Sequence, residues 1–151
     1  MFAWELDDGS KGIELLHSSG LPSGAPNRTQ TWFSPLDSGW GLAIESLYIG
    51  APFEFIGAFV YDAKGQPRWV VGDSNSNTGG SIQLTGHRPH CPGCPWIADW
   101  SSDSQPAGRL QLGYQGQSAG TLGTSIQLPP PYRGGWMREA LPIQPVAPPV
   151  Q

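Results

Sequence analysis

Four short stretches in the middle of the chain decide the fold class: residues 40–45 (WGLAIE), 53–61 (FEFIGAFVY), 62–65 (DAKG) and 67–71 (PRWVV). Three of them alternate in chemistry from one residue to the next, and a period of two predicts β-strands with two distinct faces. The DAKG stretch predicts a type I turn that is closed by a left-handed glycine. Trp40 and Trp69 fall on the bulky faces of their strands, and we predict that both lie in the core.

Short stretches of the same kind, bounded by Gly, Pro, Asn and Asp, recur along most of the chain. The further expected strands are Phe2–Leu6, Gly12–Leu16, Ser81–Thr85, Gly108–Tyr114, Gly120–Leu128 and Gly135–Leu141. Charged residues make up only 13% of the chain, which is too few for the polar faces of a helical bundle. The sequence therefore predicts an all-β fold, a small antiparallel up-and-down (meander) β-barrel, with a β-sandwich as the alternative.

Composition shifts divide the 151 residues into four parts. Residues 1–18 are expected to form an N-terminal β-hairpin, and residues 19–30 a polar linker. Residues 31–141 form the predicted barrel module. Residues 142–151 are rich in proline, which is typical of an extended tail.

Charge and hydropathy exclude several classes of partner. The formal net charge is −4, and the eight Lys and Arg residues are scattered singly, so no basic stripe for nucleic acid is present. No apolar run approaches the roughly 20 residues of a membrane-spanning helix. Nothing after Met1 in this chain reads as a signal peptide. The expectation is a protein that binds no nucleic acid and does not insert into a membrane.

One segment has the composition of a metal site: His87, His90, Cys91 and Cys94 are four zinc-capable side chains within eight residues. Tetrahedral sites normally bring together two ligand pairs from separated elements, and two prolines stiffen this stretch. We therefore expect no metal and no cofactor, with zinc kept as an alternative to a local disulfide or free thiols.

Two clusters in the predicted loops suit a ligand that has apolar faces and polar edges. The first consists of Trp96 and Trp100 with Asp99 between them, and the second is the loop that carries Asp73, Asn75 and Asn77. Aromatic faces stack on the C–H surfaces of sugar rings, while carboxylates and amides bind hydroxyl groups. These six residues are the predicted ligand-binding site, although two tryptophans that anchor a loop to the barrel would look the same.

A pair of carboxylates keeps a hydrolase possible. Glu45 and Glu54 fall on neighbouring predicted strands, and glycoside hydrolysis needs two carboxyl groups about 5–9.5 Å apart. The simpler interpretation is that both face solvent, so we expect no catalytic residues.

Residues 32–35 (WFSP), 38–42 (SGWGL) and 59–70 (FVYDAKGQPRWV) together resemble a bacterial repeat module of secreted or envelope proteins. The resemblance extends over residues 31–141, and it implies export. In an oxidising compartment, Cys91 and Cys94 are expected to form a disulfide. Residues 2–9 resemble the hairpin that ends such a module, so here they either finish a preceding repeat or supply permuted barrel strands.

Taken together, these features predict a non-catalytic ligand-binding module of an exported bacterial protein. Its expected partner is a glycan or a small polar ligand, bound through loop aromatics. Two alternatives remain: a structural spacer or protein-interaction repeat that contacts a neighbouring module, and a hydrolase that uses Glu45 and Glu54.

Overall fold

A computed structural model describes residues 2–5, 11–14, 21–78, 80–87 and 104–146 of the chain. These residues form strands joined by turns, with a single short 3₁₀ turn among them. Of the segments described, none is a helix with the length and apolar character needed to span a membrane.

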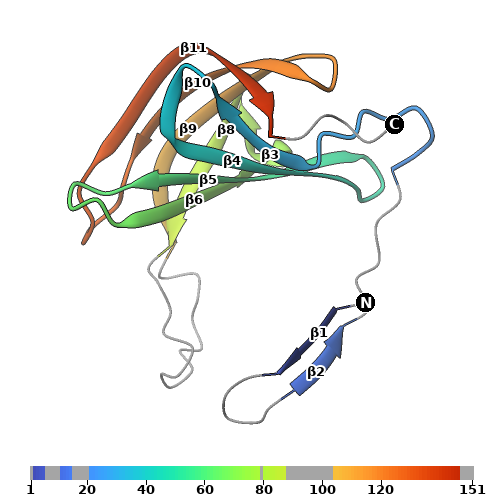
Figure 1. The fold of residues 1–151 in the computed structure, drawn as a ribbon, viewed down its shortest axis with the longest axis horizontal. Coiled ribbons are helices and arrows are strands. Elements are labelled where there is room, and N and C mark those ends of the chain that lie inside the picture. Colours follow the sequence, from blue (N-terminus) through green and yellow to red (C-terminus); the bar gives the residue numbers. More distant parts are fainter. Residues whose placement is uncertain (1, 6–10, 15–20, 79, 88–103, 147–151) are drawn as a thin grey trace.

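The elements follow the chain in a simple order (Figure 1). Two short strands come first, β1 (Phe2–Glu5) and β2 (Lys11–Glu14). The barrel strands are β3 (Gln30–Ser34), β4 (Asp37–Tyr48), β5 (Pro52–Tyr61), β6 (Pro67–Asp73), β8 (Ser81–His87), β9 (Ser104–Gln115), β10 (Ala119–Gln127) and β11 (Gly135–Pro145). Between β6 and β8 lie the 3₁₀ turn η1 (Ser74–Ser76) and the two-residue strand β7 (Asn77–Thr78).

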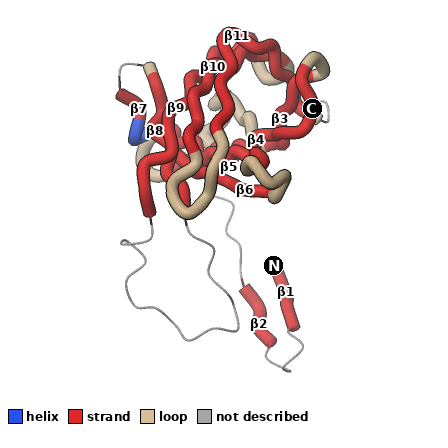
Figure 2. The backbone as a smooth tube through the Cα atoms, turned by 90° about the vertical axis from the view of Figure 1, so that its left-hand side faces the viewer, coloured by secondary structure: helices blue, strands red, loops and turns tan. Residues whose placement is uncertain are grey.

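The eight barrel strands close into an antiparallel meander, which confirms the predicted barrel and excludes the sandwich. Each pairs with its neighbours in the chain, and two seams complete the ring (Figure 2). The first seam joins β6 to β8 and includes the pair Val70 and Gly86. The second seam joins β3 to β11 and includes the pair Trp32 and Pro145. Each seam is short, with two register pairs in the described residues, and together the seams turn the open meander into a ring.

The two strands of the first seam each carry a glycine at a position where a side chain would not fit. A Cβ atom on Gly72 would lie only 2.5 Å from the backbone oxygen of Gln83. A Cβ atom on Gly86 would lie 2.9 Å from the ring of Pro129. A side chain at position 72 would push β6 away from β8, and one at position 86 would collide with the segment that follows β10, so glycine is needed at both positions.

The barrel interior is filled by side chains. Fifteen buried apolar residues form one cluster, and its largest member, Trp32, has no exposed surface. The other members are Leu42, Ile44, Ile56, Ala58, Val60, Val70, Ile82, Leu84, Ala107, Leu110, Leu122, Ile126, Leu128 and Ile143. An eight-stranded barrel has room for about this filling. The stable part of the molecule is therefore a packed core, with its polar chemistry at the ends and on the outside.

One predicted core residue is misplaced. Trp40 packs against the core cluster as expected, but Trp69 is half exposed, and its neighbour Val70 is the buried residue. Alternation shows which residues share a face and leaves open which face turns inward. The narrow interior takes the aliphatic face of β5 and β6, and the aromatic face turns to solvent.

The C-terminal boundary also differs from the prediction. Strand β11 continues four residues beyond 141, through Pro142 and Pro145. Within that extension Ile143 is buried in the core, and the next residue pairs with Phe33 of β3. Part of the expected tail is thus the strand that forms the second seam. Proline is tolerated there because this part of β11 makes few ladder bonds with β3.

The local predictions agree with the structure where it describes them. Strands β1 and β2 pair as an antiparallel hairpin, and the barrel closes without them. The turn at residues 62–65 has Gly65 at φ 74° and a hydrogen bond from its N–H to the carbonyl of Asp62.

Candidate functional site

The outer side of β5 and β6 carries a row of solvent-exposed aromatic rings, which we call the aromatic face. The exposed fractions are 41% for Phe55, 49% for Phe59, 56% for Tyr61 and 52% for Trp69. Phe59 and Trp69 sit directly opposite each other in register. Because Ile56, Ala58 and Val60 alternate with these rings and fill the core, the rings must point outward. Contiguous exposed apolar surface of this kind marks binding sites.

A position without a side chain separates the two phenylalanines of the aromatic face. Gly57 lies between them, and its register partners are Ala43 on β4 and Val71 on β6. A Cβ atom built on Gly57 would meet nothing within 4 Å on this surface. Phe55 and Phe59 are four residues apart on a strand, so about 13 Å separates their Cα atoms. The rings thus flank a floor of small side chains.

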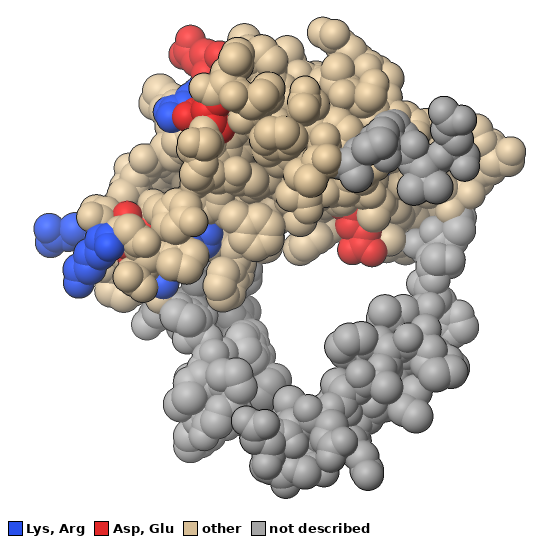
Figure 3. Space-filling view, viewed as in Figure 1, with Lys and Arg blue, Asp and Glu red and all other residues tan. Residues whose placement is uncertain are grey.

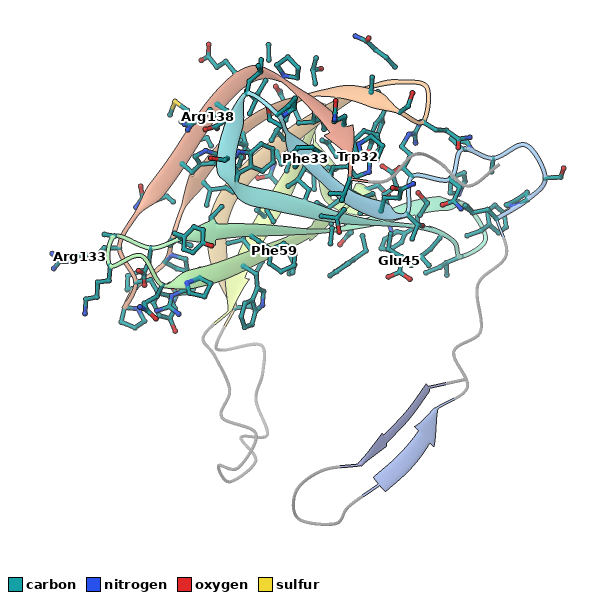
Figure 4. The ribbon with its side chains drawn as sticks, viewed as in Figure 1. Trp32, Phe33, Glu45, Phe59, Arg133 and Arg138 are labelled. Atoms are coloured by element: carbon teal, nitrogen blue, oxygen red, sulfur yellow. The ribbon has the colours of Figure 1, made fainter. Side chains whose placement is uncertain are left out.

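Polar groups border one end of the aromatic face. Glu45 of β4 and Asp73 of β6 are the register partners of Phe55 on its two sides. Glu45 is exposed, and it lies with Phe59 on the outer side of the sheet (Figure 4). Asp73 accepts a 2.9 Å hydrogen bond from the backbone N–H of Asn75. One ring therefore lies between two carboxylates on the outer surface.

The other end of the aromatic face is hollowed. A pocket of about 280 Å³ is lined by Gly39, Trp40, Phe59, Tyr61 and Pro67, together with Val60. Gly39 of β4 adds no side chain to this lining, whereas β5 supplies Phe59 and Tyr61 and β6 supplies Pro67. A ring or apolar group on this surface can lie against Phe59 and Tyr61 at once.

The predicted ligand-binding residues are only partly described. Asp73 and Asn75 lie close together, as their hydrogen bond shows, and Asn77 begins β7, which pairs with β8. Trp96, Asp99 and Trp100 lie outside the described residues, and so do His90, Cys91 and Cys94. His87 ends β8. The proposed loop cluster and the disulfide remain predictions.

The two glutamates of the hydrolase alternative point to opposite sides of the sheet. Glu45 is exposed on the outside, whereas Glu54 has the parity of Ile56 and lies at the end of the barrel interior. Register places Glu45 opposite Phe55 rather than Glu54. The structure thus does not bring this pair together, because the period of two separates neighbouring positions onto different faces.

Glu54 instead belongs to a structural cluster at one end of the barrel. Its carboxylate forms a 3.0 Å ion pair with Arg28 and accepts a 3.1 Å hydrogen bond from the hydroxyl of Tyr114. The guanidinium of Arg28 lies 3.9 Å from the centre of the Tyr114 ring. Burial, followed by the charge of Glu54, raises the pKa of Tyr114. The phenol therefore stays protonated and donates to Glu54.

A second cluster of one arginine, one carboxylate and one tyrosine lies at the opposite end of the barrel. Arg68 forms a 2.8 Å ion pair with the buried carboxylate of Asp62 and lies 4.1 Å from the centre of the Tyr132 ring. The backbone N–H of Gln66 is the main cause that lowers the pKa of Asp62, with the N–H of Lys64 and the charge of Arg68 adding to it. An ionised, fully engaged carboxylate is suited to holding the turn and poorly suited to donating a proton.

A third arginine cluster connects β4 with β11. Arg138 binds Asp37 through its Nε atom at 2.6 Å, and Asp37 also accepts a 3.1 Å hydrogen bond from the indole of Trp40. Trp40 packs on Trp136 with ring centres 4.6 Å apart. The hydrogen bond from Arg138 lowers the pKa of Asp37. This cluster bridges the two sides of the barrel near the second seam.

The outer side of β9, β10 and β11 has a different character, and we call it the polar face. Its pocket of about 290 Å³ is lined by Arg109, Gln111, Ser125 and Glu139, among others. A bulge in β11 places Ala140 at φ 48°, a left-handed conformation that is uncommon for alanine. No aromatic residue lines this pocket.

Sequence reasoning missed Phe55, Phe59 and Tyr61 as candidate binding residues. The available signal was that β5 combines an aromatic face with a face of Ile, Ala and Val, and the smaller face fits the interior of a small barrel. Within the described ranges, no group of three or more His, Cys, Asp or Glu side chains is placed to hold a metal ion.

Comparison of the chain with models of known protein families, with curated protein sequences and with solved structures finds no match.

Proposed function

We propose that this protein is a non-catalytic glycan-binding module, and that a polysaccharide lies along its aromatic face. The observation that carries the proposal is the row of half-exposed rings on β5 and β6, which the packed core does not use. Burying these rings against water would favour binding at about 25 cal/mol per Å² of apolar surface covered. The rigid strands beneath hold the rings in place before a ligand arrives.

The chemistry of the aromatic face fits a sugar chain in particular. Pyranose rings offer apolar C–H faces to an aromatic ring and hydroxyl groups at their edges. Phe55 supplies a ring, and Glu45 and Asp73 beside it supply acceptors for hydroxyl groups. The pocket next to Phe59 and Tyr61 gives a second place for a sugar ring. An extended chain could therefore contact both ends of the row.

The filled interior also favours an outer site. Eight-stranded barrels that hold a ligand inside need an open lumen. Here the centre is occupied by Trp32 and its neighbours, and arginine clusters lie at both ends. A ligand larger than a few atoms must bind on the surface.

A variant of Trp69 tests the proposal. Titration of the wild-type chain with a panel of plant, fungal and bacterial polysaccharides should shift its tryptophan fluorescence with at least one of them. The Trp69→Ala variant should then bind about tenfold more weakly by calorimetry, which is about 1.4 kcal/mol and near the upper value for one aromatic contact. Met137→Ala is the matched control, since Met137 is 64% exposed away from the aromatic face.

The outcomes separate the alternatives. If the wild-type chain binds no polysaccharide, the proposal is overturned. If the chain instead self-associates and Trp69→Ala abolishes that association, the aromatic face is an interface between modules, as a spacer repeat would need. If Trp100→Ala removes binding and Trp69→Ala does not, the predicted loop cluster is the site.

Export to the cell exterior or envelope belongs to the same proposal. It is supported by the resemblance of residues 31–141 to a secreted bacterial repeat module. A disulfide between Cys91 and Cys94 would accompany export, and mass spectrometry with and without reductant tests it.

A further inference from the structure

Positive charge gathers at the end of the barrel where the aromatic row stops. Figure 3 shows Lys and Arg side chains clustered at the end that the β5–β6 turn and the β10–β11 loop share. Lys64 and Arg133 are both exposed there. Tyr61, the last ring of the aromatic face, lies three residues before Lys64 in the chain.

A backbone hydrogen bond joins the two loops that carry these cations. The N–H of Ala63 donates to the carbonyl of Arg133 at 2.7 Å, so the residue before Lys64 is bound directly to Arg133. The turn itself is fixed by the carboxylate of Asp62, which accepts from the N–H of Lys64 at 2.8 Å and from that of Gln66 at 3.0 Å. The two cations are thus presented from a rigid base.

Neither cation is neutralised within the described part of the chain. The carboxylate of this end, Asp62, forms its ion pair with Arg68, and no ion pair involves Lys64 or Arg133. This local excess of positive charge occurs in a chain of net charge −4. The carboxylates beside the aromatic face, Glu45 and Asp73, lie at its opposite end, next to Phe55.

We infer that the glycan on the aromatic face is anionic, and that Lys64 and Arg133 bind its acidic group beside Tyr61. The shared ligand chemistry is a carboxylate or sulfate on a sugar ring that follows the rings stacked on Phe59 and Trp69. A negatively charged protein repels a polyanion in general, so tight binding of an acidic polymer requires a local basic site of this kind. The inference rests on the proposed function.

Pairs of polymers that share a backbone and differ in charge provide the test. Polygalacturonate and its methyl-esterified form represent the carboxylate, and dextran sulfate and dextran represent the sulfate. The wild-type chain should bind one acidic polymer about tenfold more tightly than its neutral partner at low salt, as expected for two partly exposed charge contacts. The Lys64→Gln/Arg133→Gln variant should lose that preference, as should the wild-type chain in 0.5 M salt, where the Debye length falls to about 4 Å.

Two controls separate charge from stacking. Arg109→Gln removes an exposed cation of the polar face and should leave the preference unchanged. Trp69→Ala should weaken binding of the acidic polymer as well, which simple ion exchange would not show. Equal binding of charged and neutral partners, or a preference that survives in Lys64→Gln/Arg133→Gln, overturns the inference and leaves the proposed function standing. Binding of none of the four polymers, nor of the wider polysaccharide panel, overturns both.

Discussion

The aromatic face and the polar face stand on the same packed interior and differ sharply in chemistry. On β5 and β6, inward aliphatic residues alternate with outward rings such as Phe59 and Trp69. On β9 and β10, inward Leu110 and Leu122 alternate with outward polar and small residues such as Arg109 and Gly123. The strands beneath both faces supply buried aliphatic side chains to the same core. Packing of the core therefore does not require the aromatic rings on the outside of β5 and β6.

Binding should depend on the outer face that carries a substitution, whereas stability depends on the single core that both faces share. Changes at the seams should destabilise the whole barrel, whereas a change on one outer face should affect binding at that face alone.

The largest effect is expected at the first seam, where β6 of the aromatic face pairs with β8. Gly72→Ala places a Cβ atom 2.5 Å from the backbone oxygen of Gln83, and backbone cannot yield cheaply. We expect a loss of roughly 2–4 kcal/mol in the free energy of unfolding, measured by urea denaturation. Gly57→Ala is the matched control, since its Cβ atom meets open space. A wild-type midpoint for Gly72→Ala would mean that β6 and β8 do not approach as described.

A matched pair of glycine substitutions compares the two faces directly. Gly57→Thr places a side chain between Phe55 and Phe59, and Gly123→Thr makes the same change on the polar face, where the flexible end of Gln111 is the nearest neighbour at 3.3 Å. Threonine suits a strand better than glycine, so stability should rise by about 0.5–1 kcal/mol in each variant. Only Gly57→Thr should weaken polysaccharide binding, several-fold by calorimetry. Equal effects of the two variants on binding would contradict an aromatic-face site.

The smallest effect concerns the ion pair between Asp37 of β4 and Arg138 of β11. The pKa of Asp37 is lowered in the folded chain, so its contribution to stability is complete above its unfolded pKa of about 3.9 and disappears as the pH falls through the lower folded value. Thermal melts between pH 6 and pH 2 should show a smaller acid destabilisation for Asp37→Asn than for wild type. The same comparison with Asp62→Asn reports on the β5–β6 turn, whose carboxylate pKa is also lowered. Parallel pH profiles for wild type and Asp37→Asn would show that the ion pair contributes nothing.

Short-range patterns in the chain are enough to predict its local structure. The period of two in residues 40–45, 53–61 and 67–71 predicts the central strands, and the DAKG turn between the last two is formed as expected. These features depend on neighbours in the chain, whose steric and hydrogen-bonding preferences are intrinsic. The same information leads to the all-β meander, because consecutive hairpins must close or stack to cover the edges of their sheet.

Long-range packing sets which side of each strand faces inward and where the ring closes. Trp69 is half exposed because the interior of an eight-stranded barrel accommodates Val70 and Ala58 in preference to a double row of rings. The seam between Trp32 and Pro145 joins residues more than a hundred positions apart, and no local preference encodes such a contact. The aromatic face forms only because the aliphatic side chains of β5 and β6 pack inward. In the sequence the two sides of each strand are interchangeable, so the alternating pattern alone does not reveal the candidate site.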